Sequence, residues 1–241
     1  MNQTARALLP GACLIVAMSG ASAAVIESRF DTGGEGWTTG SITRTGLWFA
    51  IDPAVASPVN YDPARQLIQT YDVFPWTTFR SSPAYGGNRS AFFGGSISYD
   101  LSDAANDPGM PYPNIAILAR SGDMIFIPTT APNTTGFTHY DFALDSSAGW
   151  LTTFLGRASD TYIRTVLADV DGIWINADWK TGDESANDDS RLDNVCLRDP
   201  ASVCDGRPVP VPKTLALLGA GLMLLGLWRR TERAGQVLKD D

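Results

Sequence analysis

Hydrophobic and polar residues alternate along much of the chain, and Gly, Pro, Asn and Asp separate short apolar runs. A period of two places successive side chains on opposite faces of a β-strand. Many short strands with turns between them predict an all-β sandwich or jelly roll. Strands are expected at Leu47 to Ile51, Ser96 to Leu101, Ile115 to Ala119, Met124 to Ile127, Thr138 to Leu144 and Ile173 to Trp179, and one helical turn between Ser159 and Ala168.

The strand expected at Ile173 to Trp179 shows the alternation most clearly. Its two faces would carry Ile173, Ile175, Ala177 and Trp179 on one side, and Trp174, Asn176 and Asp178 on the other. The apolar face is expected to point into the core.

The N-terminus has the pattern of a secretory signal peptide. Arg6 provides a positive charge, Ala7 to Met18 is mostly apolar, and Ala21-Ser22-Ala23 matches an A-x-A cleavage site before Ala24. Residues 1–23 are therefore expected to form a signal helix that signal peptidase removes.

The C-terminus contains a second apolar run, from Leu215 to Trp228, followed by Arg229 and Arg230. A membrane helix needs about 20 residues, so this run is expected to form a short single transmembrane helix. The Lys213 side chain before it would extend its charged end to the membrane surface. Arginines beyond the run place the C-terminus in the cytoplasm by the positive-inside rule. Residues 234–241 would then be a cytoplasmic tail, with residues 25–208 on the far side of the membrane.

Composition and charge narrow the possible partners. The 241 residues carry 18 Lys and Arg against 26 Asp and Glu, giving a formal net charge of -8. An acidic surface repels phosphate backbones, which excludes nucleic acid as a natural partner. No linker divides residues 25–207, whose length suits one domain.

Two cysteines remain once the signal peptide is removed. Cys196 and Cys204 lie eight positions apart. An even pair in an exported chain predicts a disulfide. A metal site or a redox thiol is the alternative, but the chain has no CxxC motif and no histidine close to this pair in the sequence.

The C-terminal segment resembles the PEP-CTERM sorting signal of Gram-negative bacteria. Val209-Pro210-Val211-Pro212 occupies the place of the short proline motif, and the glycine-containing run from Leu215 to Leu222 and Arg229-Arg230 follow it. The family's usual glutamate between the prolines is Val211 here. The resemblance implies that an exosortase-like transpeptidase recognises and cuts residues 208–233. Until that cut, the expected transmembrane helix would anchor the protein in the membrane.

Three segments resemble the laminin B (laminin IV) domain. They are Ser28 to Trp37, Phe92 to Leu101, and Val166 to Trp179 with Leu192 to Leu197. Together they span about residues 26–198 of the expected 25–207 domain. The resemblance implies a jelly-roll, galactose-binding-like sandwich and a role in adhesion or a matrix.

Catalytic signals are sparse. His139 is the only histidine, it lies in an alternating strand, and no G-x-S-x-G motif accompanies it. Zinc chemistry lacks ligands. A pair of carboxylates, as in a glycoside hydrolase, remains as the enzymatic alternative.

Oxygen-rich and aromatic residues suggest binding sites. Asp183 to Ser190 is an acidic loop that could be either solvated or a calcium ligand. The fold resemblance implies a structural Ca²⁺ between the first and last strands, held by Glu27, Asp31 and Asp193. Trp76 and Tyr112 lie in expected loops, where an exposed ring could stack on a sugar.

These observations predict an exported, non-catalytic protein of the cell surface or exopolysaccharide matrix of a biofilm. Its expected partners are signal peptidase, an exosortase-like transpeptidase and exopolysaccharide. The alternative is a secreted hydrolase that acts on polysaccharide with paired carboxylates.

Overall fold

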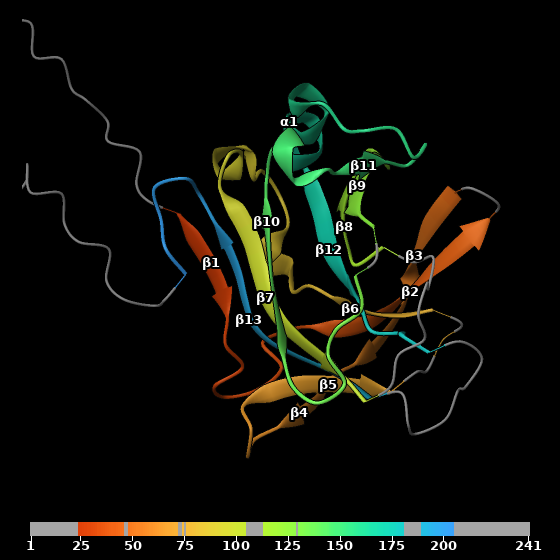
Figure 1. Ribbon diagram of the computed structural model, residues 1–241, viewed down its shortest axis with the longest axis vertical. Helices are drawn as coiled ribbons and strands as arrows, with labels where there is room; N and C mark the ends of the chain where they lie inside the picture. Colours follow the sequence, from red (N-terminus) through yellow and green to blue (C-terminus); the bar gives the residue numbers. More distant parts are fainter. Residues whose placement is uncertain are drawn as a thin grey trace, which may run out of the picture.

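The fold is a sandwich of two antiparallel β-sheets (Figure 1). The computed structural model describes residues 24–45, 48–71, 74, 76–104, 113–128, 130–180 and 189–204. The first sheet has the order β10-β7-β13-β5-β4, and β1 also pairs with β13. Its strands are β1 (Val25–Ser28), β4 (Asn60–Asp62), β5 (Leu67–Tyr71), β7 (Ser96–Asp103), β10 (Thr138–Ala143) and β13 (Asp189–Arg198).

The second sheet has the order β11-β9-β8-β12-β6-β2-β3. Its strands are β2 (Thr38–Thr45), β3 (Trp48–Pro58), β6 (Thr77–Arg80), β8 (Ile115–Ala119), β9 (Met124–Ile127), β11 (Leu151–Thr152) and β12 (Val170–Asn176). Three 3-10 turns, η1 (Pro83–Tyr85), η2 (Ser90–Phe92) and η3 (Ser146–Ala148), complete the described elements with one α-helix, α1 (Asp160–Ala168). The prediction of an all-β sandwich is confirmed.

The core lies between the two sheets. Alternate residues of each strand point inward, as the pleat requires. The first sheet contributes Ile68, Ile97, Tyr99, Leu101, Leu192, Val195 and Leu197, and the second contributes Phe79, Ile115, Ile117, Ile125, Ile127, Ile173 and Ile175. Burial of such side chains stabilises the fold by about 1.5 to 3 kcal/mol each.

The strands predicted from alternation or from an apolar run at β7 to β10 are confirmed. β8 and β9 have the predicted bounds, and β7 and β10 agree within two residues. β12 begins three residues before the predicted start and ends at Asn176, although Ala177 and Trp179 still join the core. β3 is much longer than the predicted Leu47 to Ile51.

A second apolar cluster covers the other face of the seven-stranded sheet. Trp174 lies there, opposite Ile173 and Ile175, with Ile42, Trp76, Ala116, Met124 and Phe126. Both faces of β12 are therefore buried.

The helix α1 is longer than the single turn that was expected. The Ser159 side chain caps its first turn by accepting a hydrogen bond from the Tyr162 backbone N (3.2 Å). Ile163, Val166 and Leu167 are buried against the sandwich. The helix lies at one end of the molecule (Figure 1).

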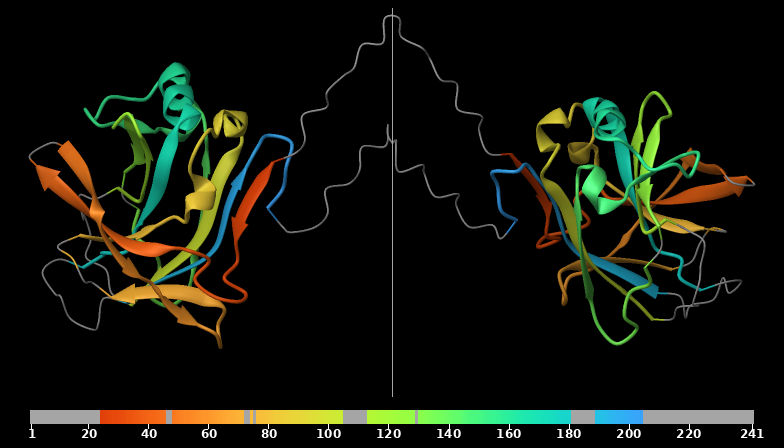
Figure 2. Two further views of the ribbon diagram at one scale, coloured as in Figure 1. Left: turned by 180° about the vertical axis from the view of Figure 1, so that it is seen from behind. Right: turned by 45° about the horizontal axis from the view of Figure 1, so that its top comes forward.

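The two ends of the described chain meet at one edge of the first sheet. β1 pairs with β13 from Val25↔Arg198 to Ser28↔Val195, and Figure 2 shows the two strands side by side. The segment after β13 then passes close to the start of β7. A Cβ atom at Gly95 would lie 2.0 Å from the Arg198 carbonyl oxygen, so only glycine allows this approach.

We predict that Gly95→Ala destabilises the protein by about 3 kcal/mol, because the neighbouring backbone must move to admit one methyl group. Urea unfolding of the purified protein measures the change. Gly136→Ala is the matched control, since a Cβ atom there meets nothing within 4 Å. Equal stabilities of the two variants would contradict this explanation of Gly95.

Candidate functional site: a polar cleft beside the disulfide

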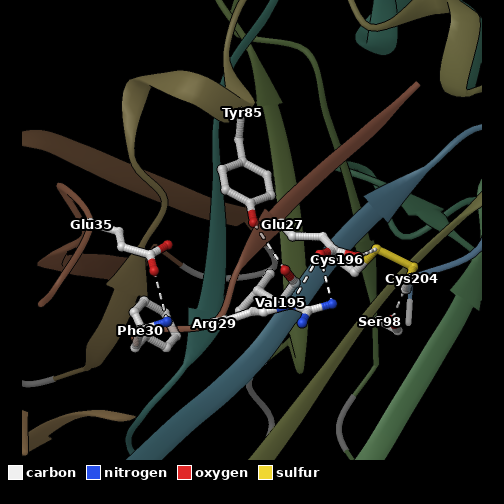
Figure 3. Close-up of polar contacts among 9 residues, drawn as sticks. All are labelled: Glu27, Arg29, Phe30, Glu35, Tyr85, Ser98, Val195, Cys196 and Cys204. Atoms are coloured by element: carbon white, nitrogen blue, oxygen red, sulfur yellow. Dashed lines mark hydrogen bonds and ion pairs between the residues drawn. A yellow bond between two sulfur atoms is a disulfide. The ribbon is translucent and has the colours of Figure 1, made fainter. Parts of the chain in front are cut away.

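A cleft of about 280 Å³ opens on the outer face of the first sheet. Its walls come from β1, β7, β10, β13 and the segment that follows β13. The lining residues are Glu27, Arg29, Ser98, His139, Asn194, Val195, Cys196 and Cys204. We refer to it as the disulfide cleft, and Figure 3 shows most of its residues.

Strand register assembles the cleft. Glu27 pairs with Cys196, and Cys196 pairs with Ser98, so three strands place these side chains in one row. Neighbouring residues Val195, Leu197, Ile97 and Tyr99 belong to the core, which puts the row on the opposite, outer face.

The predicted disulfide between Cys196 and Cys204 is confirmed, with an S–S distance of 2.10 Å. The Ser98 hydroxyl donates to Cys204 Sγ (3.9 Å), and a Glu27 carboxylate oxygen lies 3.9 Å from Cys196 Sγ (Figure 3). The bond therefore fastens the segment after β13 to the sheet at the cleft wall.

A β-bulge in β13 brings Asn194 to the cleft, where Asp100 of β7 links it to His139 of β10. Between Asp193 and Cys196 the register with β7 shifts by one residue, and Asn194 adopts a left-handed backbone (φ 50). Asn194 Nδ2 donates to Asp100 Oδ2 (2.8 Å), and Asp100 Oδ1 lies 2.7 Å from His139 Nδ1. Asp100 thus orients both a side-chain amide and an imidazole.

The His139–Asp100 pair does not continue to a nucleophile among the described residues. Ser98 lines the same cleft, but its hydroxyl hydrogen bond goes to Cys204 Sγ. A serine nucleophile needs a hydroxyl–imidazole hydrogen bond. The imidazole is instead well exposed, which suits contact with a bound molecule.

Glu27 in β1 and Arg29, the first residue after β1, form an ion pair. Arg29 Nη2 and Nε both lie 3.0 Å from Glu27 Oε2. The pair leaves Glu27 Oε1 beside the disulfide, and the Arg29 side chain is partly exposed.

The segment after β1 is held in place by a backbone-to-side-chain hydrogen bond and by a buried aromatic ring. The Phe30 backbone N donates to Glu35 Oε1 (2.8 Å), and both residues adopt left-handed backbones (φ 55 and 49). The Phe30 ring is fully buried and meets Trp37 edge to face. The carboxylate of Glu35 thus closes a turn within the segment Ser28 to Trp37 that carries part of the laminin B resemblance.

Tyr85 from η1 contacts both this segment and β13. Its ring packs edge to face on Trp37, and its hydroxyl donates to the Val195 carbonyl oxygen (3.1 Å) in β13 (Figure 3). Burial raises the pKa of this hydroxyl well above its ordinary value, so it remains a donor.

The calcium ligands expected from the fold resemblance do not fit as a set. Among the described residues, no group of three or more His, Cys, Asp or Glu side chains could hold a metal ion. The Glu27 carboxylate is engaged by Arg29. The acidic loop Asp183 to Ser190 lies mostly outside the described residues.

Asp193, the third expected ligand, shows how acidic this region is. Burial raises its pKa to about 6, and the charges of Asp100, Asp31 and Glu35 add to the rise, against a hydrogen bond from the Asn194 backbone N.

The two aromatic residues expected to stack on sugars are not part of the cleft. The expectation for Trp76 is wrong, because its ring is buried at 2% exposure and its Nε1 donates to Asn176 Oδ1 (2.9 Å). Tyr112 lies outside the described residues.

The expected signal peptide, the expected sorting motif Val209 to Pro212 and Arg229-Arg230 also lie outside the described residues. No described helix has the length and hydropathy of a membrane span.

Sequence reasoning missed Arg29, His139 and Asn194 as members of one site. The signals that pointed to this place were the cysteine pair and Glu27, which the fold resemblance implied as a calcium ligand. Strand register across distant segments brings the other residues to it.

We predict that Asp193→Asn stabilises the protein at pH 7.5 by about 1 to 2 kcal/mol. A raised pKa in the folded state means that Asp193 favours folding when protonated, and this contribution is lost as the pH rises through about 6. Asparagine removes the charge and keeps an oxygen for the Asn194 backbone N. Urea unfolding at several pH values should show the difference vanishing near pH 4. A difference that persists unchanged at pH 4 would contradict the assignment.

Comparisons with known proteins support the fold. No protein-family model and no curated protein sequence matches the chain. The structure is similar to the L4b domain of human laminin alpha-2, with a TM-score of 0.52 and 14% sequence identity. The similarity covers 61% of this chain and 88% of that domain. At this identity it shows a laminin-like sandwich fold and no more.

Proposed function

We propose that this protein is an exported, non-catalytic module of the cell surface or exopolysaccharide matrix, and that the disulfide cleft contacts polysaccharide. The observation that carries the proposal is the Cys196–Cys204 disulfide in the wall of the cleft. Disulfides persist in oxidising compartments outside the cytosol. The laminin-like sandwich fold is compatible with such a location.

The chemistry of the cleft suits sugar hydroxyl groups. It offers a guanidinium and an amide as donors, a carboxylate as acceptor and an imidazole that can do either. His139 is well exposed and Arg29 is partly exposed, so their hydrogen-bonding groups can be reached without a large desolvation cost. The charges of Glu27 and Arg29 offset each other, which favours neutral over strongly anionic sugars.

A shallow polar cleft binds weakly, and a matrix role is compatible with this. A polymer of repeating sugars can contact many anchored copies at once, so avidity replaces affinity at a single site.

The hydrolase alternative gains no support from the described clefts. Besides the disulfide cleft with Glu27, a cleft of about 390 Å³ is lined by Asp171 and a third of about 340 Å³ by Asp103. Each of these three clefts has a single carboxylate in its lining, whereas glycoside hydrolysis uses two facing ones.

The route to the surface is proposed from the sequence. Residues 1–23 act as a signal peptide, and residues 208–233 act as a sorting signal of the PEP-CTERM type that an exosortase-like transpeptidase reads. The finer fold assignment, a jelly-roll of the galactose-binding type, is proposed on the same basis.

We predict that replacing Arg29 and His139 together with glutamine weakens binding to exopolysaccharide from the native host about tenfold, because about 1.4 kcal/mol of hydrogen bonding is lost. Affinity electrophoresis through gels containing the polysaccharide measures the change. Arg120→Gln, which lines the cleft of Asp171, is the matched control and should bind as the wild type does.

Two results would contradict the proposal. Equal retardation of wild-type and cleft variants would remove the cleft from binding. Release of new reducing ends from the polysaccharide by the wild-type protein would favour the hydrolase instead.

A further inference from the structure

The first described residue is held by a buried carboxylate near the last strand. The Ala24 backbone N donates to Asp199 Oδ2 (2.7 Å), and the Asp199 backbone N donates in return to the Ala24 carbonyl oxygen (3.0 Å). This two-way contact extends the β1–β13 ladder by one residue, directly beyond the Val25↔Arg198 pair.

The Asp199 side chain is buried, and hydrogen bonds fix its position. Only 7% of the residue is exposed. Its second oxygen, Oδ1, accepts hydrogen bonds from the Ser202 hydroxyl (2.6 Å) and the Ala201 backbone N (3.0 Å). Gly95 permits this close packing, because a side chain there would collide with the backbone of Arg198 and Asp199.

Asp199 is charged but has no cationic partner among the described residues. Burial by itself raises its pKa, but the hydrogen bonds from Ser202, Ala24 and Ala201 outweigh burial and leave the pKa below the ordinary value. All of these donors are neutral. A buried carboxylate without a positive partner carries a desolvation cost that a cation could offset.

Cleavage between Ala23 and Ala24 would create such a cation at the atom already in place. The nitrogen that lies 2.7 Å from Asp199 Oδ2 would change from a neutral amide to an α-ammonium group. Hydrogen bonds with one charged partner are stronger than neutral ones, and those joining two opposite charges are stronger still.

We propose that Asp199 is the docking site for the α-ammonium group that removal of residues 1–23 creates on Ala24. The inference rests on the proposed export. Leader removal then strengthens the attachment of β1, a strand of only four residues, to β13. The precursor keeps the weaker neutral contact, so maturation completes the closure of the sandwich edge.

The test is a thermodynamic cycle on the full chain exported with its own leader. One variant inserts Gly-Ser-Gly between Ala23 and Ala24, which moves the new amino group three residues away and leaves Ala24 as a neutral amide. The second variant is Asp199→Asn, and the third combines both changes. N-terminal sequencing of each purified protein establishes where it begins, and thermal unfolding gives its Tm.

The insertion should lower the Tm of the wild type by about 3 to 6 °C, the loss of one strong charge pair in a domain of this size. In the Asp199→Asn background the insertion should have almost no effect. Ser202→Ala keeps the carboxylate, so the full effect of the insertion should persist there. If Asp199→Asn does not fold, pH decides the question: deprotonation of the α-ammonium group removes the charge pair, so the effect of the insertion should shrink at alkaline pH, and an effect that stays constant there overturns the docking site.

The outcomes separate the two proposals. A wild-type protein that begins at Ala24 but tolerates the insertion without a change in Tm overturns the docking site and leaves export intact. An effect of equal size with and without the Asp199 carboxylate overturns it as well. A protein that reaches no external compartment and keeps residues 1–23 overturns both.

Discussion

The insertion of β13 between β7 on one side and β1 and β5 on the other is the constraint on which the rest of the structure depends. This last strand closes the first sheet and contributes Leu192, Val195 and Leu197 to the core. The same strand carries Asn194 and Cys196 to the cleft, and Asp199 follows it at the contact with Ala24. Fold, cleft and chain ends are thus positioned by one segment. Pairing residues about 170 positions apart also means that the first sheet closes only when the whole domain is available.

Several small features protect this pairing. Gly95 leaves room for the backbone beyond β13, the Cys196–Cys204 disulfide fastens the segment that follows, and the Tyr85 hydroxyl holds the Val195 carbonyl oxygen. The bulge at Asn194 is part of the same arrangement, because it turns the local side chains toward Asp100 and His139 while Val195 returns to the core. The cleft is therefore a consequence of how the edge of the sandwich is closed. The two ends of the described chain therefore lie side by side at this edge.

The sequence predicted those parts of the fold in which local pattern and structure agree. Alternation located β7 and β10, apolar runs located β8 and β9, the segment from Ser159 to Ala168 was expected to hold a helical turn, and the cysteine pair located the disulfide. β13 was not predicted as a strand by periodicity, because the extra residue at Asn194 breaks the period of two between Leu192 and Val195. Trp76 was misplaced because a tryptophan near Pro75 reads as a loop residue, whereas a second apolar cluster buries it. The cleft could not be predicted, since Arg29, His139 and Asn194 meet only through the register of distant strands.

We propose that this disulfide-bonded laminin-like sandwich is delivered outside the cell and released from its membrane segment. Intact-mass analysis of the protein recovered from the exterior of its native host tests this most directly. We expect a chain that ends near residue 210, with a mass lower by two hydrogens than that of its reduced form. A mass that retains Trp228 to Asp241 would contradict the sorting and cleavage and leave a permanently anchored protein.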